Sequence, residues 1–118
     1  MSRPQFDPSA YAAQLEDKKS RLAGLLAPFA APAPEVFESP REHYRLRAEF
    51  RAWQHDGGWD YAMFDPENPR QPVLMADFPV ADAAICALMP KLRAATLAVD
   101  ALHRRLYGVE FLATLSGD

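Results

Sequence analysis

The sequence is poor in cysteine and has no long apolar run. Its single cysteine, Cys86, excludes an internal disulfide and a zinc site built from several cysteines. The longest stretch without a charged residue, 22–34, is interrupted by three prolines. It therefore cannot supply the roughly 20 apolar residues that a membrane-spanning helix needs. The first residues, Met-Ser-Arg-Pro-Gln, carry no apolar run and do not resemble a secretory signal. We expect a cytoplasmic location and no membrane association.

Motifs for cofactors, metals and nucleophilic catalysis are also missing. The only adjacent glycines, Gly57 and Gly58, have the composition of a turn, so no glycine-rich cofactor loop is predicted. The three histidines lack the spacing of metal-binding motifs, and no metal site is predicted. Cys86 lies in an apolar segment, where a thiol usually behaves as a small hydrophobic side chain. We therefore assign no catalytic, cofactor-binding or metal-binding residue to this chain.

The overall amino-acid composition is typical of one globular domain. The chain has 118 residues, of which 49% are hydrophobic and 25% are charged. The formal net charge of −3 excludes the bulk basicity of histone-like proteins and basic tails. Nucleic-acid binding therefore requires a local basic patch. Four arginines against two glutamates lie between positions 41 and 51, which makes that segment the place to look.

Helical and strand patterns along the chain predict an α+β fold. Asp7-Pro8-Ser9 is typical of a helix start, and apolar spacing predicts a helix over 9–26 that ends before Pro28. A second helix is predicted after Pro79, with a kink or break at Pro90 and helical turns to about 104. Strands are predicted at 43–53, 59–64, around 73–75 and at 109–115. We expect an antiparallel sheet of about four strands with two or three helices.

The strand at 43–53 is the best candidate site, because apolar and polar residues alternate strictly along it. One face is expected in the core, and the other presents His43, Arg45, Arg47, Glu49, Arg51 and Trp53. Arginines two residues apart on a strand are spaced by about 7 Å, close to the spacing of phosphates. Trp53 adds a stacking surface, which favours single-stranded RNA as the ligand. The alternative is a solvated strand face on which Glu49 pairs with a neighbouring arginine.

A second small basic cluster precedes the last predicted strand. Arg104 and Arg105 lie close to Tyr107, which could stack on a base. The alternative for Tyr107 is a half-buried residue at the strand boundary. The chain then reaches Ser116-Gly117-Asp118, which has the composition of a hairpin turn. We therefore expect the chain to stop within a β-hairpin, as the front portion of a longer protein.

Several stretches carry a family resemblance that covers nearly the whole chain in register. The most specific is the run from 34 to 51, which includes Pro-Glu-Val-Phe at 34–37 and His-Tyr-Arg-Leu-Arg-Ala-Glu-Phe-Arg at 43–51. Weaker matches are Asp-Phe-Pro at 77–79 and Leu-x-Thr-Leu-Ser at 112–116. The sequence resembles the N-terminal part of the bacterial tRNA (uracil-5-)-methyltransferases.

The resemblance implies a role in gripping RNA rather than in chemistry. In that family an N-terminal region helps to hold the tRNA T-arm, and a C-terminal Rossmann-like domain binds S-adenosylmethionine for methylation of C5 of the T-loop uridine. The family's nucleophilic cysteine, general base and glycine-rich cofactor loop have no match in this chain. Arg51 matches a position implicated in tRNA contact, and Tyr107 falls where the family carries an aromatic residue against the T-loop. Arg45 and Arg47 match the motif and are assigned on strand periodicity.

The resemblance and the residues together predict an N-terminal tRNA-binding region over residues 1–118, inactive alone and without the Rossmann-like domain. The expected RNA-binding residues are Arg45, Arg47, Arg51, Trp53 and Tyr107. Two alternatives stay open. The chain could be a free-standing RNA-binding module, or a protein-interaction domain that uses an open edge strand. The oligomeric state is not predicted.

Overall fold

The computed structural model describes residues 7–118. Residues 1–6, on which the expectation of no secretory signal rests, lie outside the described part. The described residues divide into two compact units, one formed by residues 7–41 and the other by residues 42–118. Among the described residues, no helix combines the length and apolar character that a bilayer-crossing segment requires.

The N-terminal unit consists of one main helix flanked by two short 3-10 turns. The turn η1 (Pro8–Ala10) leads into α1 (Tyr11–Leu26), which is followed by η2 (Ala27–Phe29). The carboxylate of Asp7 accepts a hydrogen bond of 2.9 Å from the Ser9 amide, as a helix-capping side chain does. The predicted helix over 9–26 is therefore confirmed. Its apolar side chains are not buried within this unit.

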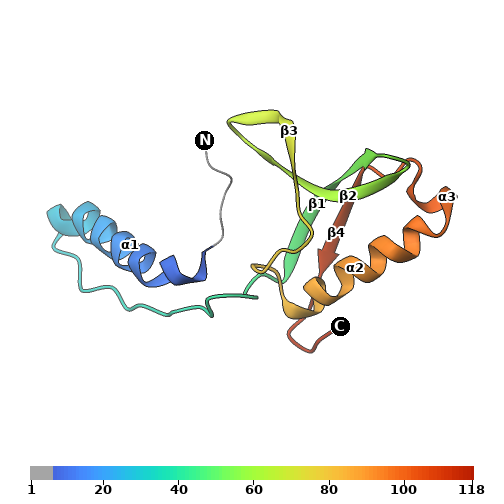
Figure 1. Ribbon diagram of the computed structural model, residues 1–118. Helices are drawn as coiled ribbons and strands as arrows, with labels where there is room; N and C mark the ends of the chain where they lie inside the picture. Colours follow the sequence, from blue (N-terminus) through green and yellow to red (C-terminus); the bar gives the residue numbers. More distant parts are fainter. Residues whose placement is uncertain (1–6) are drawn as a thin grey trace. The chain divides into compact units, whose positions relative to one another are not determined.

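The second unit is built on a four-stranded antiparallel sheet, shown in Figure 1. Its strands are β1 (Arg47–His55), β2 (Gly58–Asp65), β3 (Asn68–Leu74) and β4 (Gly108–Leu112), arranged in the order β3-β2-β1-β4. Between β1 and β2, Asp56 and Gly57 have φ values of 49° and 76°. Positive φ at both central residues defines the type I′ turn that matches the twist of a hairpin. The α+β class and the four-stranded sheet are confirmed.

Three strands differ from the prediction by more than one residue. β4 ends at Leu112 and not at position 115, because residues 115 and 116 form a turn. β1 begins at Arg47 and not at position 43, because His43 has a φ of 55° and the backbone of Arg45 pairs with the segment at Ala81 instead of continuing the ladder. β3 is longer than the predicted 73–75, although it contains Pro69 and Pro72. Proline is tolerated there because β3 lies at the edge of the sheet, where an amide need not donate to a neighbouring strand.

One face of the sheet forms the core against α2 (Ala83–Leu97), as Figure 1 shows. Its centre is Phe50, whose ring makes edge contacts with Tyr61, Phe78 and Phe111 at centroid distances of 5.3 to 6.2 Å. From α2, Ile85 and Met89 are buried against this face. The burial of alternate residues along β1 confirms the alternation seen in the sequence.

The helix α2 continues through Pro90, so of the kink or break predicted at this residue, a break does not occur. Proline removes one hydrogen bond of the helix ladder, but packing of the neighbouring turns can outweigh that cost. Met89 is fully buried, and its carbonyl oxygen accepts a hydrogen bond of 2.7 Å from the Tyr61 hydroxyl. The helical turns predicted to about 104 are present as a separate short helix, α3 (Asp100–His103).

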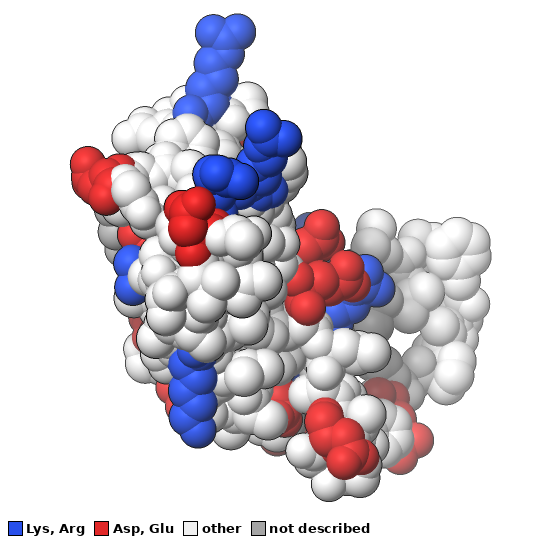
Figure 2. Space-filling view, turned by 90° about the vertical axis from the view of Figure 1, so that its right-hand side faces the viewer, with Lys and Arg blue, Asp and Glu red and all other residues white. Residues whose placement is uncertain are grey.

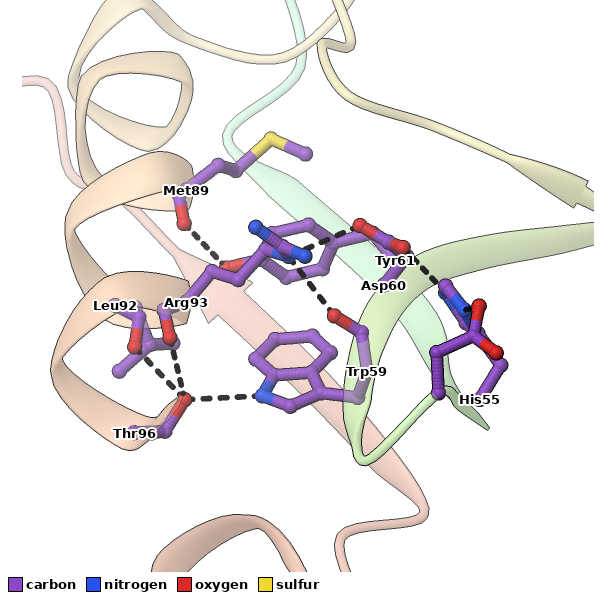
Figure 3. Close-up of polar contacts among 9 residues, drawn as sticks. His55, Trp59, Asp60, Tyr61, Met89, Leu92, Arg93 and Thr96 are labelled. Carbon is purple, nitrogen blue, oxygen red and sulfur yellow. Dashed lines mark hydrogen bonds and ion pairs between the residues drawn. The ribbon is translucent and has the colours of Figure 1, made fainter. Parts of the chain in front are cut away.

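A polar cluster fastens β2 to α2, and Figure 3 shows its members. Arg93 of α2 donates from Nε to the Trp59 carbonyl at 2.8 Å and forms an ion pair with Asp60 at 2.9 Å. The other carboxylate oxygen of Asp60 contacts the His55 ring. Hydrogen bonds to Asp56, which has the larger effect, and to Asp60 raise the pKa of His55 above its ordinary value. The cluster fixes the end of the β1–β2 hairpin on the helix.

Candidate nucleic-acid interface

The face of the sheet that points away from α2 carries the candidate site. We call this face of the sheet the open face. In an antiparallel pair, residues directly opposite each other point to the same side. Register therefore places the outward residues of β1 beside those of β2 and β4. By register, the open face includes Arg47, Glu49, Arg51 and Trp53 of β1, Asp60, Ala62 and Phe64 of β2, Leu74 of β3, and Gly108, Glu110 and Leu112 of β4.

Arg51 and Trp53 meet on this face through a residue that the sequence did not single out. The guanidinium of Arg51 lies 5.5 Å from the centroid of the Phe64 ring, within the range of a cation–π contact. The Trp53 ring is tilted against the same Phe64 at 6.1 Å and is 39% exposed. Two aromatic rings and one exposed cation are thus brought together, which is an arrangement that suits stacking and phosphate contact.

Arg47 is on the same face but already has a partner. Its guanidinium forms an ion pair with Glu110 of the neighbouring strand β4, and both side chains are more than half exposed. The predicted pairing of Glu49 with a neighbouring arginine is wrong among the described residues, because Arg47 pairs with Glu110 of β4 instead. An exposed ion pair contributes little stability, so Arg47 could still exchange Glu110 for another anion at small cost.

Arg45 and Tyr107 lie outside the ladder that holds the other candidates. Arg45 is exposed but precedes β1, so the predicted row of three evenly spaced arginines on one strand is not formed. Tyr107 precedes β4, and its carbonyl accepts a hydrogen bond of 2.9 Å from the Ala52 amide. Its side chain is 77% exposed, so the half-buried alternative is wrong. Its neighbour His103 is buried and does not add to the basic cluster.

A hollow of about 290 Å³ lies on the open face beside Arg51. It is lined by Glu49, Phe50, Arg51, Ala62, Met63, Phe64 and Gly108. Gly108 stands opposite Arg51 in the register, and its lack of a side chain leaves that position of the face empty. The volume is near the lower end of the range for ligand pockets, roughly 300–1,000 Å³. The hollow therefore suits a single small group.

Cys86 lies close to a histidine, but the geometry does not activate it. The Nδ1 atom of His43 is 3.8 Å from the Cys86 sulfur and is hydrogen-bonded to the Ala81 carbonyl at 2.8 Å. The thiol itself contacts the Phe78 carbonyl at 3.2 Å. Burial raises the pKa of the Cys86 thiol, and the nearby Asp77 carboxylate raises it further by a smaller amount. A thiol that holds its proton more tightly is a poor nucleophile.

The charge on the surface is mixed. Figure 2 shows basic and acidic side chains interspersed on the face it presents, without one sign dominating. Any RNA contact made by this chain must therefore be local, as the net charge of −3 already required.

Comparison with known proteins identifies the family. The sequence model described as tRNA (Uracil-5-)-methyltransferase matches residues 10–118. The chain belongs to this family. Methyltransferases of this kind from three bacteria are closely similar to it, and each is named tRNA/tmRNA (uracil-C(5))-methyltransferase.

The similarity to these methyltransferases covers the whole chain. Identity is 68% to the protein of Pseudomonas aeruginosa, 62% to that of Azotobacter vinelandii and 61% to that of Ectopseudomonas mendocina. The alignment in turn covers 32–33% of each relative. The chain thus spans about a third of the length of these curated methyltransferases.

The glycines of residues 7–118 lie in α1, at turns and in β4. Gly24 is in α1, Gly57 and Gly58 lie at the β1–β2 turn, and Gly108 and Gly117 lie in β4 and the turn after it. Among the described residues, none of these glycines connects a strand to a helix.

Proposed function

We propose that this chain is the N-terminal, RNA-binding portion of a tRNA (uracil-5-)-methyltransferase. The enzyme would transfer a methyl group from S-adenosylmethionine to C5 of the T-loop uridine of tRNA, in the cytoplasm. The portion described here would hold the T-arm and would not transfer methyl groups alone. The observation that carries the proposal is the exposed Arg51 guanidinium, which rests on Phe64 beside Trp53.

The physical basis is the combination of charge with stacking surfaces. An arginine on an aromatic ring keeps its N–H donors directed outward, where they can contact phosphate oxygens. RNA loops also present unstacked bases that pack on aromatic side chains. Arg47 would extend this contact along the open face, and Arg45 and Tyr107 would extend it beyond that face. The exposure of all three residues is compatible with that role.

Replacing Arg51 with alanine is expected to weaken binding of a T-arm hairpin RNA about three- to tenfold. One phosphate contact should be lost, so the slope of log affinity against log salt should fall by about 1. The measurement is a fluorescence titration of labelled hairpin at two or more salt concentrations. Arg21→Ala is the matched control, because Arg21 is an exposed arginine of α1 that is paired with Asp17. Affinity that is insensitive to salt, or equal for Arg51→Ala and the unmodified chain, would contradict the proposal.

The free edge of β4 supports a second part of the proposal, that the sheet extends beyond four strands. The Ala113 amide bonds to the Leu46 carbonyl, so odd-numbered residues of β4 face β1. The amides and carbonyls of Gly108, Glu110 and Leu112 then point to the other edge. Beyond them, the Thr114 amide donates to the Asp118 carbonyl at 3.1 Å, and Gly117 has a φ of 95°.

The hydrogen bond between Thr114 and Asp118 closes a three-residue turn with a left-handed glycine, a common hairpin connection. We therefore propose that residues 1–118 end within a β-hairpin, whose next strand would run antiparallel along β4. The same edge could instead accept a strand from another protein, which is the protein-interaction alternative. A free-standing RNA-binding module remains the third reading, and it requires only the open face.

Amide hydrogen exchange of the 118-residue chain tests the free edge directly. The amides of Gly108, Glu110 and Leu112 should exchange faster than those of Val109, Phe111 and Ala113, by at least about tenfold, because only the second set donates to β1. The amides that donate to β1 serve as the control for the amides at the free edge, because both sets belong to the same stretch of chain. Equal protection of both sets would mean that another strand already covers this edge, for example from a second copy of the chain.

A further inference from the structure

The lining of the hollow on the open face includes one acidic and one basic residue. Glu49 and Arg51 are two residues apart on β1, and both line the hollow. Among residues 7–118, neither side chain forms an ion pair. The guanidinium of Arg51 lies over the ring of Phe64. An acceptor-only group and a donor-only group are therefore available side by side to a ligand.

The strand β4 explains why Glu49 is the available carboxylate. Glu110 is directly opposite Glu49 in the register, and like charges in that position repel. Arg47 neutralises Glu110 by its ion pair, so this arginine is not free to pair with Glu49. The carboxylate of Glu49 therefore faces solvent with unmet capacity for N–H donors.

We infer that the hollow binds an unpaired guanine base of RNA, an inference that rests on the RNA-binding function proposed above. Guanine carries two adjacent donors, N1–H and the N2 amino group, which match the two oxygens of one carboxylate. It also carries two acceptors, O6 and N7, which match the fork of an arginine. Glu49 would accept from the first pair, and Arg51 would donate to the second through one edge of its guanidinium, with Phe64 beside the base. The remaining N–H donors of Arg51 stay available for the phosphate contact proposed above.

Adenine, cytosine and uracil complement the pair of Glu49 and Arg51 less well than guanine does. Adenine and cytosine each offer a single amino donor next to a ring acceptor, which would repel the carboxylate. Uracil has one N–H between two carbonyl oxygens, so a carboxylate that meets the N–H also meets an oxygen. The guanine preference thus follows from the order of donors and acceptors along the base edge.

The test compares guanosine with inosine, which lacks only the N2 amino group. Fluorescent single-stranded oligoribonucleotides, each with one guanosine, inosine or adenosine among uridines, are titrated with the chain. Guanosine should bind about tenfold more tightly than inosine, in line with the discrimination typical of bidentate base contacts. Glu49→Gln should remove the difference, because a glutamine amide cannot accept two hydrogen bonds side by side. Glu67→Gln is the matched control and should keep it, because Glu67 is an exposed glutamate of the β2–β3 turn that does not line the hollow.

The outcomes separate this inference from the function on which it rests. RNA that binds without a difference between guanosine and inosine overturns the guanine site and leaves RNA binding intact. A preference that survives Glu49→Gln also overturns it. An absence of binding to every oligonucleotide and to the T-arm hairpin would overturn both. Because Glu49 is exposed, its substitution should not unfold the chain, which far-ultraviolet circular dichroism checks.

Discussion

Replacing Trp59 with alanine is expected to lower the free energy of unfolding by about 3–5 kcal/mol, the cost typical of removing a large buried aromatic side chain. Trp59 has no exposed surface, and its ring packs edge-on against Tyr61 at 4.7 Å. Its indole N–H donates to the Thr96 hydroxyl at 3.0 Å, as Figure 3 shows. The substitution would leave a cavity between β2 and α2 and remove the hydrogen bond that the Thr96 hydroxyl accepts, while this hydroxyl still donates to helix carbonyls at 3.0 Å.

The hairpin supplies a matched control in Trp53, the other tryptophan of the chain. Trp53 is on the open face, so Trp53→Ala should cost about 1 kcal/mol or less. Urea unfolding followed by far-ultraviolet circular dichroism measures both variants without relying on tryptophan fluorescence. Equal losses for the two substitutions would contradict the assignment of the core to the α2 side of the sheet.

The elements that were predictable from sequence are those governed by local rules. Alternation at Ala48, Phe50 and Ala52 predicted a strand with one buried face, because side chains on a strand alternate with period two. Asp7 and Pro8 predicted the helix start. The glycines at 57 and 58 predicted the hairpin turn, since a tight turn needs positive φ.

The errors come from interactions between distant segments. Alternation extends back to position 43, but the backbone of Arg45 is bonded to Val80 and Asp82, about 35 residues away, and not to a strand of the sheet. Pro90 stayed inside a helix because the helix is anchored by the buried Met89. Local pattern cannot report such contacts, because tertiary packing overrides local preference.

The candidate site was predictable on β1 alone. Arg51 and Trp53 could be placed on one face by periodicity, but their shared partner Phe64 is fixed by the β1–β2 register. The pairing of Arg47 with Glu110 joins residues 63 positions apart and depends on β4 lying beside β1. The turn at Gly57 could have given the first register, by counting outward from the hairpin. The sequence carries no comparable signal for the register between β1 and β4.

Replacing Tyr61 with phenylalanine is expected to cost about 1–3 kcal/mol of unfolding free energy, the penalty for leaving a buried polar group unsatisfied. The Tyr61 side chain is 2% exposed, and its hydroxyl donates to the Met89 carbonyl. Tyr107→Phe is the matched control. Tyr107 is 77% exposed, so loss of its hydroxyl should change stability little.

The same hydroxyl gives the prediction a pH signature. Burial raises the pKa of Tyr61 from 10.0 to about 12. Between these values the unfolded chain loses this proton while the folded chain keeps it, so stability falls as the pH rises from about 10 to 12. Below pH 10 the contribution is fully present. Unfolding free energies of the unmodified chain and Tyr61→Phe, measured by urea at several alkaline pH values, should therefore converge across this interval. A constant difference between the two proteins would show that the Tyr61 hydroxyl is not held protonated by burial.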